Sequence, residues 1–217
     1  MDAVQGQTVR KTLFLIRHAE SMENEKLGSL KKFFHSIGRL ELPEWAHFYH
    51  GVSIVGEPSL VDSTLSTKGK KQVERLTEIL REENFVDAHG VELVMHSPLI
   101  RAAETAKAVF HSMPKETADH FPRFVEPLIR EKFISEWVNL GGLDKRIADF
   151  AASLVERSEE RIVVVGHSQY FRRMLGQEKK MSNCDVWHVE LEIDPASKEH
   201  RWVNLRKLHD VQVDDDQ

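Results

Sequence analysis

Three short apolar segments stand out along the chain and predict buried β-strands. They cover residues 12–17, 91–95 and 161–165. None of them alternates hydrophobic and polar residues, which is typical of strands that are covered on both faces. The sequence therefore predicts a central sheet enclosed between layers of helices.

Segments with helical spacing of apolar residues separate these strands. One begins at Ser66 and places four apolar side chains on one side, Val73, Leu76, Ile79 and Leu80. Another follows Ser97 and Pro98, which predict an N-cap and the first helical position. Residues 27–37 and 147–154 show the same spacing, and residues 187–193 and 201–205 are candidates for edge strands. This alternation predicts an α/β fold, a three-layer α/β/α sandwich with a mainly parallel central sheet.

Composition narrows the class of protein. With 217 residues, 41% of them hydrophobic and 30% charged, the chain is predicted to form one globular domain. An aromatic-rich insertion at about 25–60 and a flexible acidic tail at 210–217 are expected within it. The net charge of -5 argues against nucleic-acid and anionic-membrane partners. A lone Cys184 and the lack of a long apolar run favour a cytoplasmic protein.

Basic residues and histidines follow all three predicted strands. His18 comes after the first strand beside Arg17, Arg101 follows the second, and His167 follows the third. Ligands bind beyond the carboxyl ends of strands in such sheets, so these side chains are expected to converge. A neutral imidazole can accept a phosphoryl group, and guanidinium groups bind its oxygens. For an isolated histidine, a satisfied polar loop residue would be the first interpretation of His18, and a helix cap or surface ion pair is the lesser alternative for Arg101.

Four motifs, in this order along the chain, resemble those of the histidine phosphatase (phosphoglycerate mutase-like) superfamily. They are residues 17–21 with Asn24, the set Asp62, Leu65, Thr67, Gly69 and Gln72, residues 97–106, and residues 165–168. The resemblance implies a phosphoglycerate mutase-like fold, a phosphorylated His18, and no metal or cofactor. It also implies that a substrate phosphoryl group is bound by Arg17, Asn24, Arg101, His167 and Ser168. Ala19 stands where the family usually has glycine, and Asn24 is equally suited to cap a helix.

The proton donor for the leaving group is expected to be a carboxylic acid. Glu131 aligns best with the acid of family phosphatases, and Glu126 is the alternative. The short stretch between Glu131 and His167 favours a phosphatase over a mutase, whose family members carry a long insertion there. A non-catalytic module that binds phosphorylated ligands is the third hypothesis.

The partner is expected to be a phosphorylated small molecule, with a protein substrate left open. The oligomeric state is open too, a homodimer included. Aromatic residues of the insertion are expected to pack on the core, and a lid that selects substrates is the alternative. His47 and His50 have the spacing of metal ligands but lack a third ligand.

Overall fold

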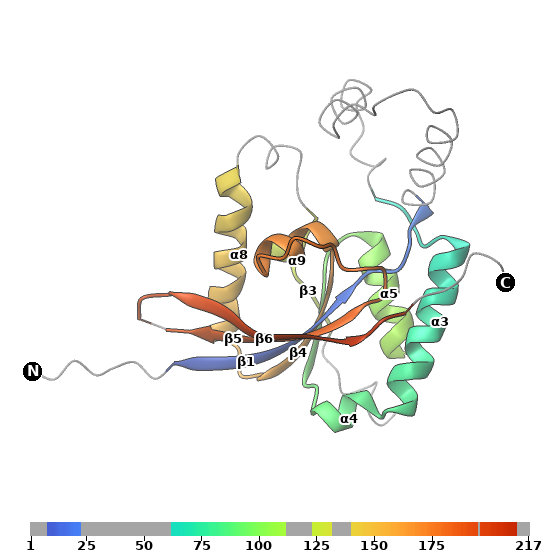
Figure 1. Ribbon diagram of the computed structural model, residues 1–217, viewed down its shortest axis with the longest axis horizontal. Helices are drawn as coiled ribbons and strands as arrows, with labels where there is room; N and C mark the ends of the chain where they lie inside the picture. The colour runs from blue at the N-terminus through green and yellow to red at the C-terminus, as the bar shows by residue number, and fades with distance from the viewer. Residues whose placement is uncertain (1–7, 23–61, 112–122, 132–139, 195, 212–217) are drawn as a thin grey trace, which may run out of the picture.

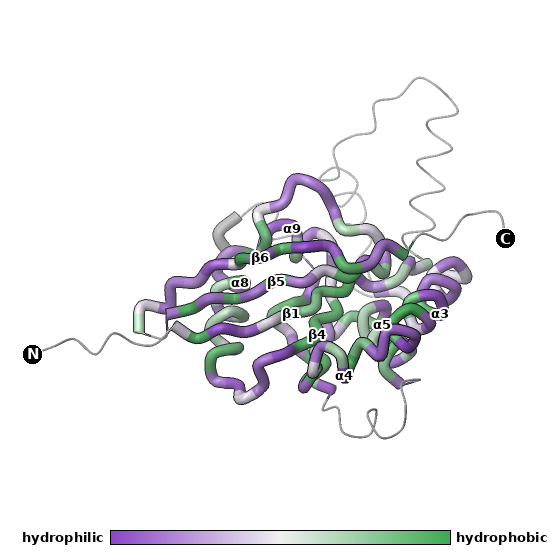
Figure 2. Tube along the Cα trace, turned by 60° about the horizontal axis from the view of Figure 1, so that its bottom comes forward, coloured by the Kyte–Doolittle hydropathy of each residue, from purple (hydrophilic) through white to green (hydrophobic). Residues whose placement is uncertain are grey.

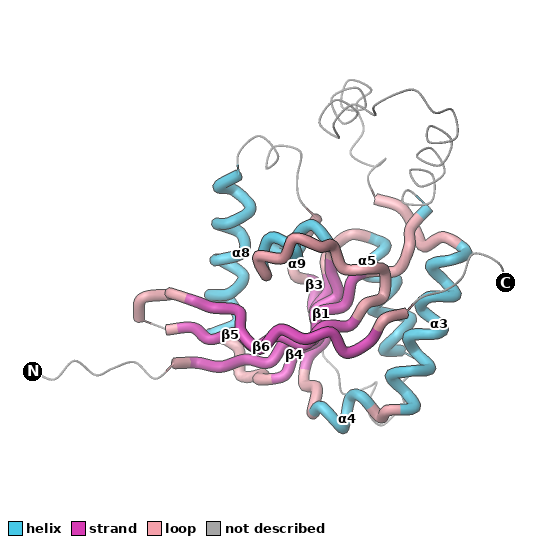
Figure 3. The backbone as a smooth tube through the Cα atoms, in the orientation of Figure 1, coloured by secondary structure: helices cyan, strands magenta, loops and turns pink. Residues whose placement is uncertain are grey.

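The computed structural model describes residues 8–22, 62–111, 123–131, 140–194 and 196–211. Its strands are β1 (Val9–Arg17), β2 (Leu93–His96), β3 (Arg123–Val125), β4 (Arg161–Gly166), β5 (Val186–Ile193) and β6 (His200–His209). Its helices are α3 (Thr67–Glu82), α4 (Phe85–His89), α5 (Ile100–His111), the 3-10 turn η2 (Pro127–Ile129), α8 (Leu140–Val155) and α9 (Ser168–Met174) (Figures 1 and 3).

The strands form one six-stranded sheet in the order β3-β2-β4-β1-β5-β6. β1 is parallel to β4, and β2 is parallel to both β4 and β3. β5 is antiparallel to β1 and to β6, so among the described strands it alone opposes the direction of β1. The prediction of a mainly parallel sheet is therefore confirmed. The expectation of an edge strand over 187–193 is wrong, because β5 is interior and β6 forms the edge.

Helices cover both faces of the sheet, as predicted. Figure 1 shows α3, α4 and α5 on one side and α8 and α9 on the other. Successive residues of β1 point to opposite faces, so Phe14 and Ile16 pack toward the first group while Leu13 and Leu15 pack toward the second. The central strands are largely hydrophobic in Figure 2, and α3 carries both hydrophobic and hydrophilic residues, with its buried residues on one side. The two cores explain why β1 and β4 show no alternation in sequence.

The predicted start of the α3 helix is confirmed. Ser66 is its N-cap, and the Ser66 hydroxyl accepts a hydrogen bond from Gly69 N at 3.0 Å. The start predicted for the next helix is wrong by two positions, because α5 begins at Ile100 and not at Pro98. Asp62, distant in sequence, accepts the hydrogen bond from Ile100 N at 2.8 Å, which a local pattern does not reveal.

Several sequence predictions fall outside the described residues. They concern Asn24, the insertion at about 25–60 with His47 and His50, and the acidic tail beyond Val211. The flexible tail was expected from Asp210, but Val211 is buried in the core and Asp210 pairs with Lys207 at 2.7 Å. The single-domain organisation of the whole chain stays a prediction. No helix in the described ranges is both long and apolar enough to cross a membrane.

Candidate active site

The tips of β1 and β4 lie side by side and bring His18 next to His167. Parallel pairing sets Arg17 opposite Gly166, and His18 N donates to Gly166 O at 3.0 Å. Ser97, directly after β2, donates its N–H to Val165 O at 3.0 Å. The three strands predicted to converge therefore end at one edge of the sheet, where the ring centroids of His18 and His167 are 5.0 Å apart.

The tautomer of His18 follows from its two contacts. Its Nδ1 lies 2.7 Å from the carbonyl oxygen of Ala19, which can only accept, so Nδ1 carries the hydrogen. The lone pair is then on Nε2, and Arg101 Nε donates to it at 3.3 Å. Burial lowers the pKa of His18 well below its ordinary value of 6.5, and the charges of Arg101 and Arg17 lower it further. His18 is thus a neutral imidazole whose unprotonated Nε2 lies next to a cationic side chain.

The loop after His18 is fixed by the start of α3. Glu20 N donates to the side-chain oxygen of Gln72 at 2.8 Å, and Ser66 N donates to Glu20 O at 2.9 Å. A side chain at Gly69 would place its Cβ only 2.0 Å from Glu20 O, so glycine is required for this close approach. The second motif of the sequence therefore supports the loop that follows His18.

Ala19 fits its place without strain. It is fully buried, and its φ is not in the left-handed region, so the methyl group in place of the usual glycine is accommodated. The Ala19 N–H donates to Thr105 Oγ1 at 3.0 Å, and that hydroxyl donates to Arg101 O at 2.7 Å. Thr105 thus links the loop that follows His18 to α5, the helix that carries Arg101.

Two guanidinium groups border the histidines. Arg101, in the first turn of α5 and 4% exposed, has Nη1 at 3.8 Å from Asp62 Oδ1 and Nη2 at 3.9 Å from Glu131 Oε2. Arg17 donates from Nη1 to Met181 O at 2.7 Å. Burial lowers the pKa of Arg17, and the carboxylates Glu131 and Asp185 act against that shift. The arrangement suits a multiply charged anion.

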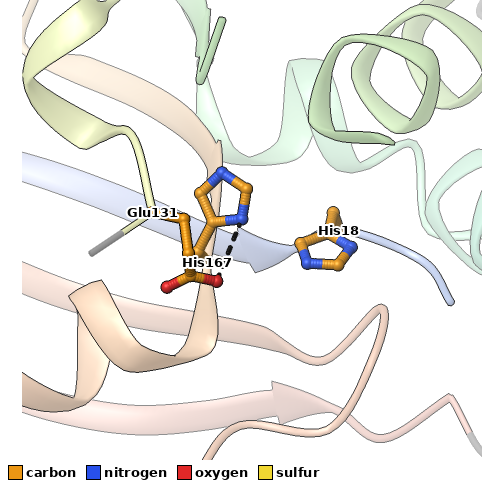
Figure 4. Close-up of side chains that lie close together, drawn as sticks. All are labelled: His18, Glu131 and His167. Carbon is orange, nitrogen blue, oxygen red and sulfur yellow. Dashed lines mark ion pairs between the residues drawn. The ribbon is translucent and has the colours of Figure 1, made fainter. Parts of the chain in front are cut away.

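His167 occupies the N-cap position of α9 and is fully buried. Its Nε2 lies 2.7 Å from Ser97 Oγ, and its Nδ1 lies 3.4 Å from Glu131 Oε2, the ion pair drawn in Figure 4. When Ser97 donates to Nε2, the hydrogen of His167 is on Nδ1 and faces Glu131 and His18. Burial lowers the pKa of His167 well below 6.5, and the charges of His18 and Arg101 add to this.

The structure separates the two candidate acids. Glu131 brings a partly exposed carboxyl group to His167 and Arg101. Glu126 is buried and accepts a hydrogen bond from Leu128 N at 3.0 Å, as the N-cap of η2. Glu131 is therefore the carboxyl group that the structure brings to the site.

Unpartnered polar atoms lie next to the strand tips. Arg17 Nε, His167 Nδ1 and Ser168 Oγ are buried and make no hydrogen bond to any residue that the structure describes. Buried polar atoms without a partner are rare in proteins, so these three call for a ligand. All of them can donate a hydrogen bond, which fits an oxyanion.

A metal ion suits this site less well than an anion. His18, Glu131 and His167 each offer a ligand atom, and these atoms lie within 4.8 Å of one another. Histidine and carboxylate are ligands that Zn²⁺ accepts. However, Arg101 Nε already bonds to the lone pair of His18 and a second guanidinium belongs to the neighbouring Arg17, so a dication would meet two positive charges.

Three residues that bond to members of the site were given no part in the site by the sequence analysis. Ser97 was taken as a helix cap and bonds to His167, and Thr105 was part of a motif only. Asn183 donates from Nδ2 to His18 O at 2.8 Å across a sequence separation of 165 residues. Next to it, Cys184 N donates to Arg17 O, and burial raises the pKa of the Cys184 thiol to about 12. No local pattern marks the loop that contains Asn183 and Cys184.

Comparisons with known proteins bear on the family and the fold of this chain. The sequence model of the Histidine phosphatase superfamily (branch 1) matches residues 58–137. No curated protein matches the sequence. A solved structure from Escherichia coli str. K-12 substr. MG1655, provisionally described as an alpha-ribazole-5'-P phosphatase, is 19% identical with a TM-score of 0.55, over 94% of this chain and 100% of that one.

A mycobacterial glucosyl-3-phosphoglycerate phosphatase is 14% identical with a TM-score of 0.52, over 91% of this chain and 97% of that chain. A protein named mycobacterial hydrolase 1 is 16% identical with a TM-score of 0.52, over 93% and 99% of the two chains. At these identities the likeness establishes the fold.

Proposed function

We propose that this chain, which matches the histidine phosphatase superfamily in sequence over residues 58–137 and in fold, is a metal-independent phosphatase of phosphomonoesters. The observation that carries the proposal is the state of His18. Its Nδ1–H is held by Ala19 O, and its Nε2 lone pair faces Arg101 in a buried site. An arrangement of this kind presents an unprotonated ring nitrogen beside a cation that can bind phosphoryl oxygens, which suits a phosphoryl acceptor.

In the first step, His18 Nε2 attacks the phosphorus atom of the substrate. An N–P bond forms while the bond from phosphorus to the ester oxygen breaks, and protonated Glu131 gives its proton to the leaving oxygen. The carbonyl of Ala19 stabilises the positive charge that develops on the imidazole ring through Nδ1–H.

In the second step, water attacks the phosphorus atom of the phosphohistidine and Glu131 takes a proton from that water. The N–P bond breaks, its electron pair returns to Nε2, and inorganic phosphate is released. Glu131 lies 3.4 Å from His167 Nδ1, on the side of the site where the leaving group departs in this proposal.

The phosphoryl oxygens are bound by Arg17, Arg101 and His167 in this mechanism. Their donors are fixed before the reaction, which stabilises charge as it develops in the transition state. The unpartnered Arg17 Nε, His167 Nδ1 and Ser168 Oγ support the assignment. The sequence adds Asn24 to this set as a further prediction.

Hydrolysis is favoured over phosphoryl transfer between acceptors because the stretch between Glu131 and His167 is short and includes α8 and β4. The mutase and the non-catalytic binding module stay as alternatives. The substrate is proposed to be a phosphorylated small molecule in the cytoplasm. Glucosyl-3-phosphoglycerate and alpha-ribazole-5'-P, named in the similar structures, are first members of a substrate panel.

The test is hydrolysis of 4-nitrophenyl phosphate in EDTA by the wild type, His18→Ala and Glu131→Gln. His111→Ala is the matched control, because His111 is exposed at the end of α5. We expect His18→Ala to lose activity by about 10⁴-fold or more, as removal of a nucleophile does. Phosphorylated wild type should be trapped by an alkaline denaturing quench, because the N–P bond of phosphohistidine hydrolyses in acid. Mass spectrometry should detect this species in the wild type and not in His18→Ala. Equal turnover by wild type and His18→Ala would refute the nucleophile, and activity abolished by EDTA would refute metal independence.

A further inference from the structure

Arg146 connects three elements around the loop that carries Glu131. It extends from α8 and donates from Nη1 to Leu128 O at 2.9 Å and to Arg130 O at 2.5 Å. Its Nη2 reaches Glu131 O at 3.5 Å. Its Cζ lies 5.2 Å from the ring centroid of Tyr170, a fully buried residue of α9.

The loop that Arg146 contacts has little regular structure of its own. Glu131 follows η2, a turn of three residues, and belongs to no helix or strand. The backbone bonds Ile129 N to Glu126 O and Arg130 N to Pro127 O that close this turn are both 3.3 Å long. A single 3-10 turn has poor hydrogen-bond geometry, so an external contact contributes much of its order.

We propose that Arg146 is a positioning residue that holds the Glu131 carboxyl group beside His167 by binding the main chain of residues 128–131. The inference rests on the proposed role of Glu131 as proton donor. Arg146 binds the main-chain oxygens of Leu128, Arg130 and Glu131, and we infer that it acts on the site through Glu131.

The planar shape of arginine is essential to this arrangement. The N–H groups at the edge of the guanidinium bind carbonyl oxygens while its face covers the Tyr170 ring. A lysine at this position keeps the charge but provides one ammonium group with no flat face. Arg146→Lys therefore separates the effect of geometry from that of charge, which also acts on the pKa of His167.

The experiment compares kcat/KM for two aryl phosphates with different leaving groups. Phenyl phosphate needs a proton on its leaving oxygen, whereas 2,4-dinitrophenyl phosphate releases a stable anion and needs none. General acid catalysis contributes about 10²–10⁴-fold, so misplacing the acid has a measurable cost. We expect Arg146→Lys and Arg146→Gln each to lower kcat/KM for phenyl phosphate by about tenfold or more, with a much smaller loss for the dinitrophenyl ester.

Lys145→Gln is the matched control. It removes one positive charge from the adjacent position of α8, where Lys145 is exposed and pairs with Asp149 at 2.7 Å. We expect wild-type values with both esters. An equal loss with both esters in the Arg146 variants would overturn the proposal, and so would full activity of Arg146→Lys. If Arg146→Gln does not fold, Arg146→Lys alone decides.

A second measurement is independent of activity. Hydrogen exchange of the Ile129 and Arg130 amides, which close η2, should be faster in Arg146→Lys than in the wild type and unchanged in Lys145→Gln. Unchanged exchange in Arg146→Lys would overturn the proposal. If the wild type hydrolyses neither ester, the proposed phosphatase function is refuted. Faster exchange in Arg146→Lys would then still establish that Arg146 anchors the loop.

Discussion

His18 and Glu131 approach His167 from two regions of the chain that are anchored differently. The main chain around His18 is bonded to three other elements: Asn183 holds His18 O, Thr105 holds Ala19 N and Gln72 holds Glu20 N. Glu131 follows a turn of three residues and is partly exposed.

A nucleophile gains from a fixed position, because attack requires aligned atoms. In the proposed mechanism the attacking water takes the place of the leaving oxygen opposite His18, so Glu131 exchanges protons at one place in both steps. The two regions therefore differ in what fixes their main chain: three side chains around His18, and a short turn with Arg146 at Glu131. Each of the following predictions changes one of these regions.

After the loss expected for His18→Ala, the next largest effect should come from replacing the proposed acid. We expect Glu131→Gln to lower kcat/KM for phenyl phosphate by about 10²–10⁴-fold, because the amide cannot give a proton to the leaving oxygen. Glu126→Gln is the control, since its side-chain oxygen can still accept from Leu128 N, and it should change the rate little. A larger loss in Glu126→Gln than in Glu131→Gln, in steady-state assays, would show that the acid is misassigned.

Gly69→Ala tests the close approach between α3 and the loop that follows His18. The added Cβ would lie 2.0 Å from Glu20 O, so α3 and the loop must separate. We expect a loss of about 1–3 kcal/mol in the free energy of unfolding, as for other overpacked sites. Lys70→Ala, an exposed change in the same helix, should leave stability nearly unchanged in urea titrations. Unaltered stability of Gly69→Ala would contradict the close approach.

Ser97→Ala tests the orientation of His167. Loss of the hydroxyl leaves His167 Nε2 buried without the partner that it has at 2.7 Å. A buried polar atom without a partner costs about 1–3 kcal/mol, so we expect roughly a tenfold lower kcat/KM. Ser97→Thr keeps the hydroxyl and should retain more activity. A Ser97→Ala enzyme as active as the wild type would mean that His167 needs no such partner.

The pH dependence of stability reports on both buried histidines. Their folded-state pKa values are lowered well below 6.5, so the unfolded chain binds more protons in mildly acidic solution. Stability should therefore fall as the pH drops below about 6.5, by at most about 1.4 kcal/mol per pH unit for each histidine. Urea unfolding at several pH values, for the wild type and a His18→Ala/His167→Ala variant, measures this. Parallel pH profiles of the two proteins would rule out the contribution.

The sequence predicted the members of the site that follow strands. His18 and His167 each come directly after a buried apolar run, and parallel strands necessarily end at one edge of the sheet. Arg101 was predicted from its place after the second strand and from a family motif, and Glu131 from the resemblance to family phosphatases. The spacing of apolar residues predicted α3 and α8 because both helices bury one side against the sheet.

Contacts between distant segments could not be predicted in this way. Asn183 and Arg146 act on the main chain of His18 and of Glu131 from loops or helices far along the chain, and a single polar residue carries no local signal of such a partner. The start of α5 was misplaced for the same reason, since Asp62 caps it from another segment. The interior position of β5 depends on tertiary pairing with β6.

β1 is paired along both of its edges, with β4 on one side and β5 on the other. Strands bonded on both sides open at a higher free energy than a short turn such as η2. Heating of this protein can therefore act in two stages. Mild heating would reversibly loosen the turn that precedes Glu131, and melting of the sheet that carries His18 and His167 would require a higher temperature.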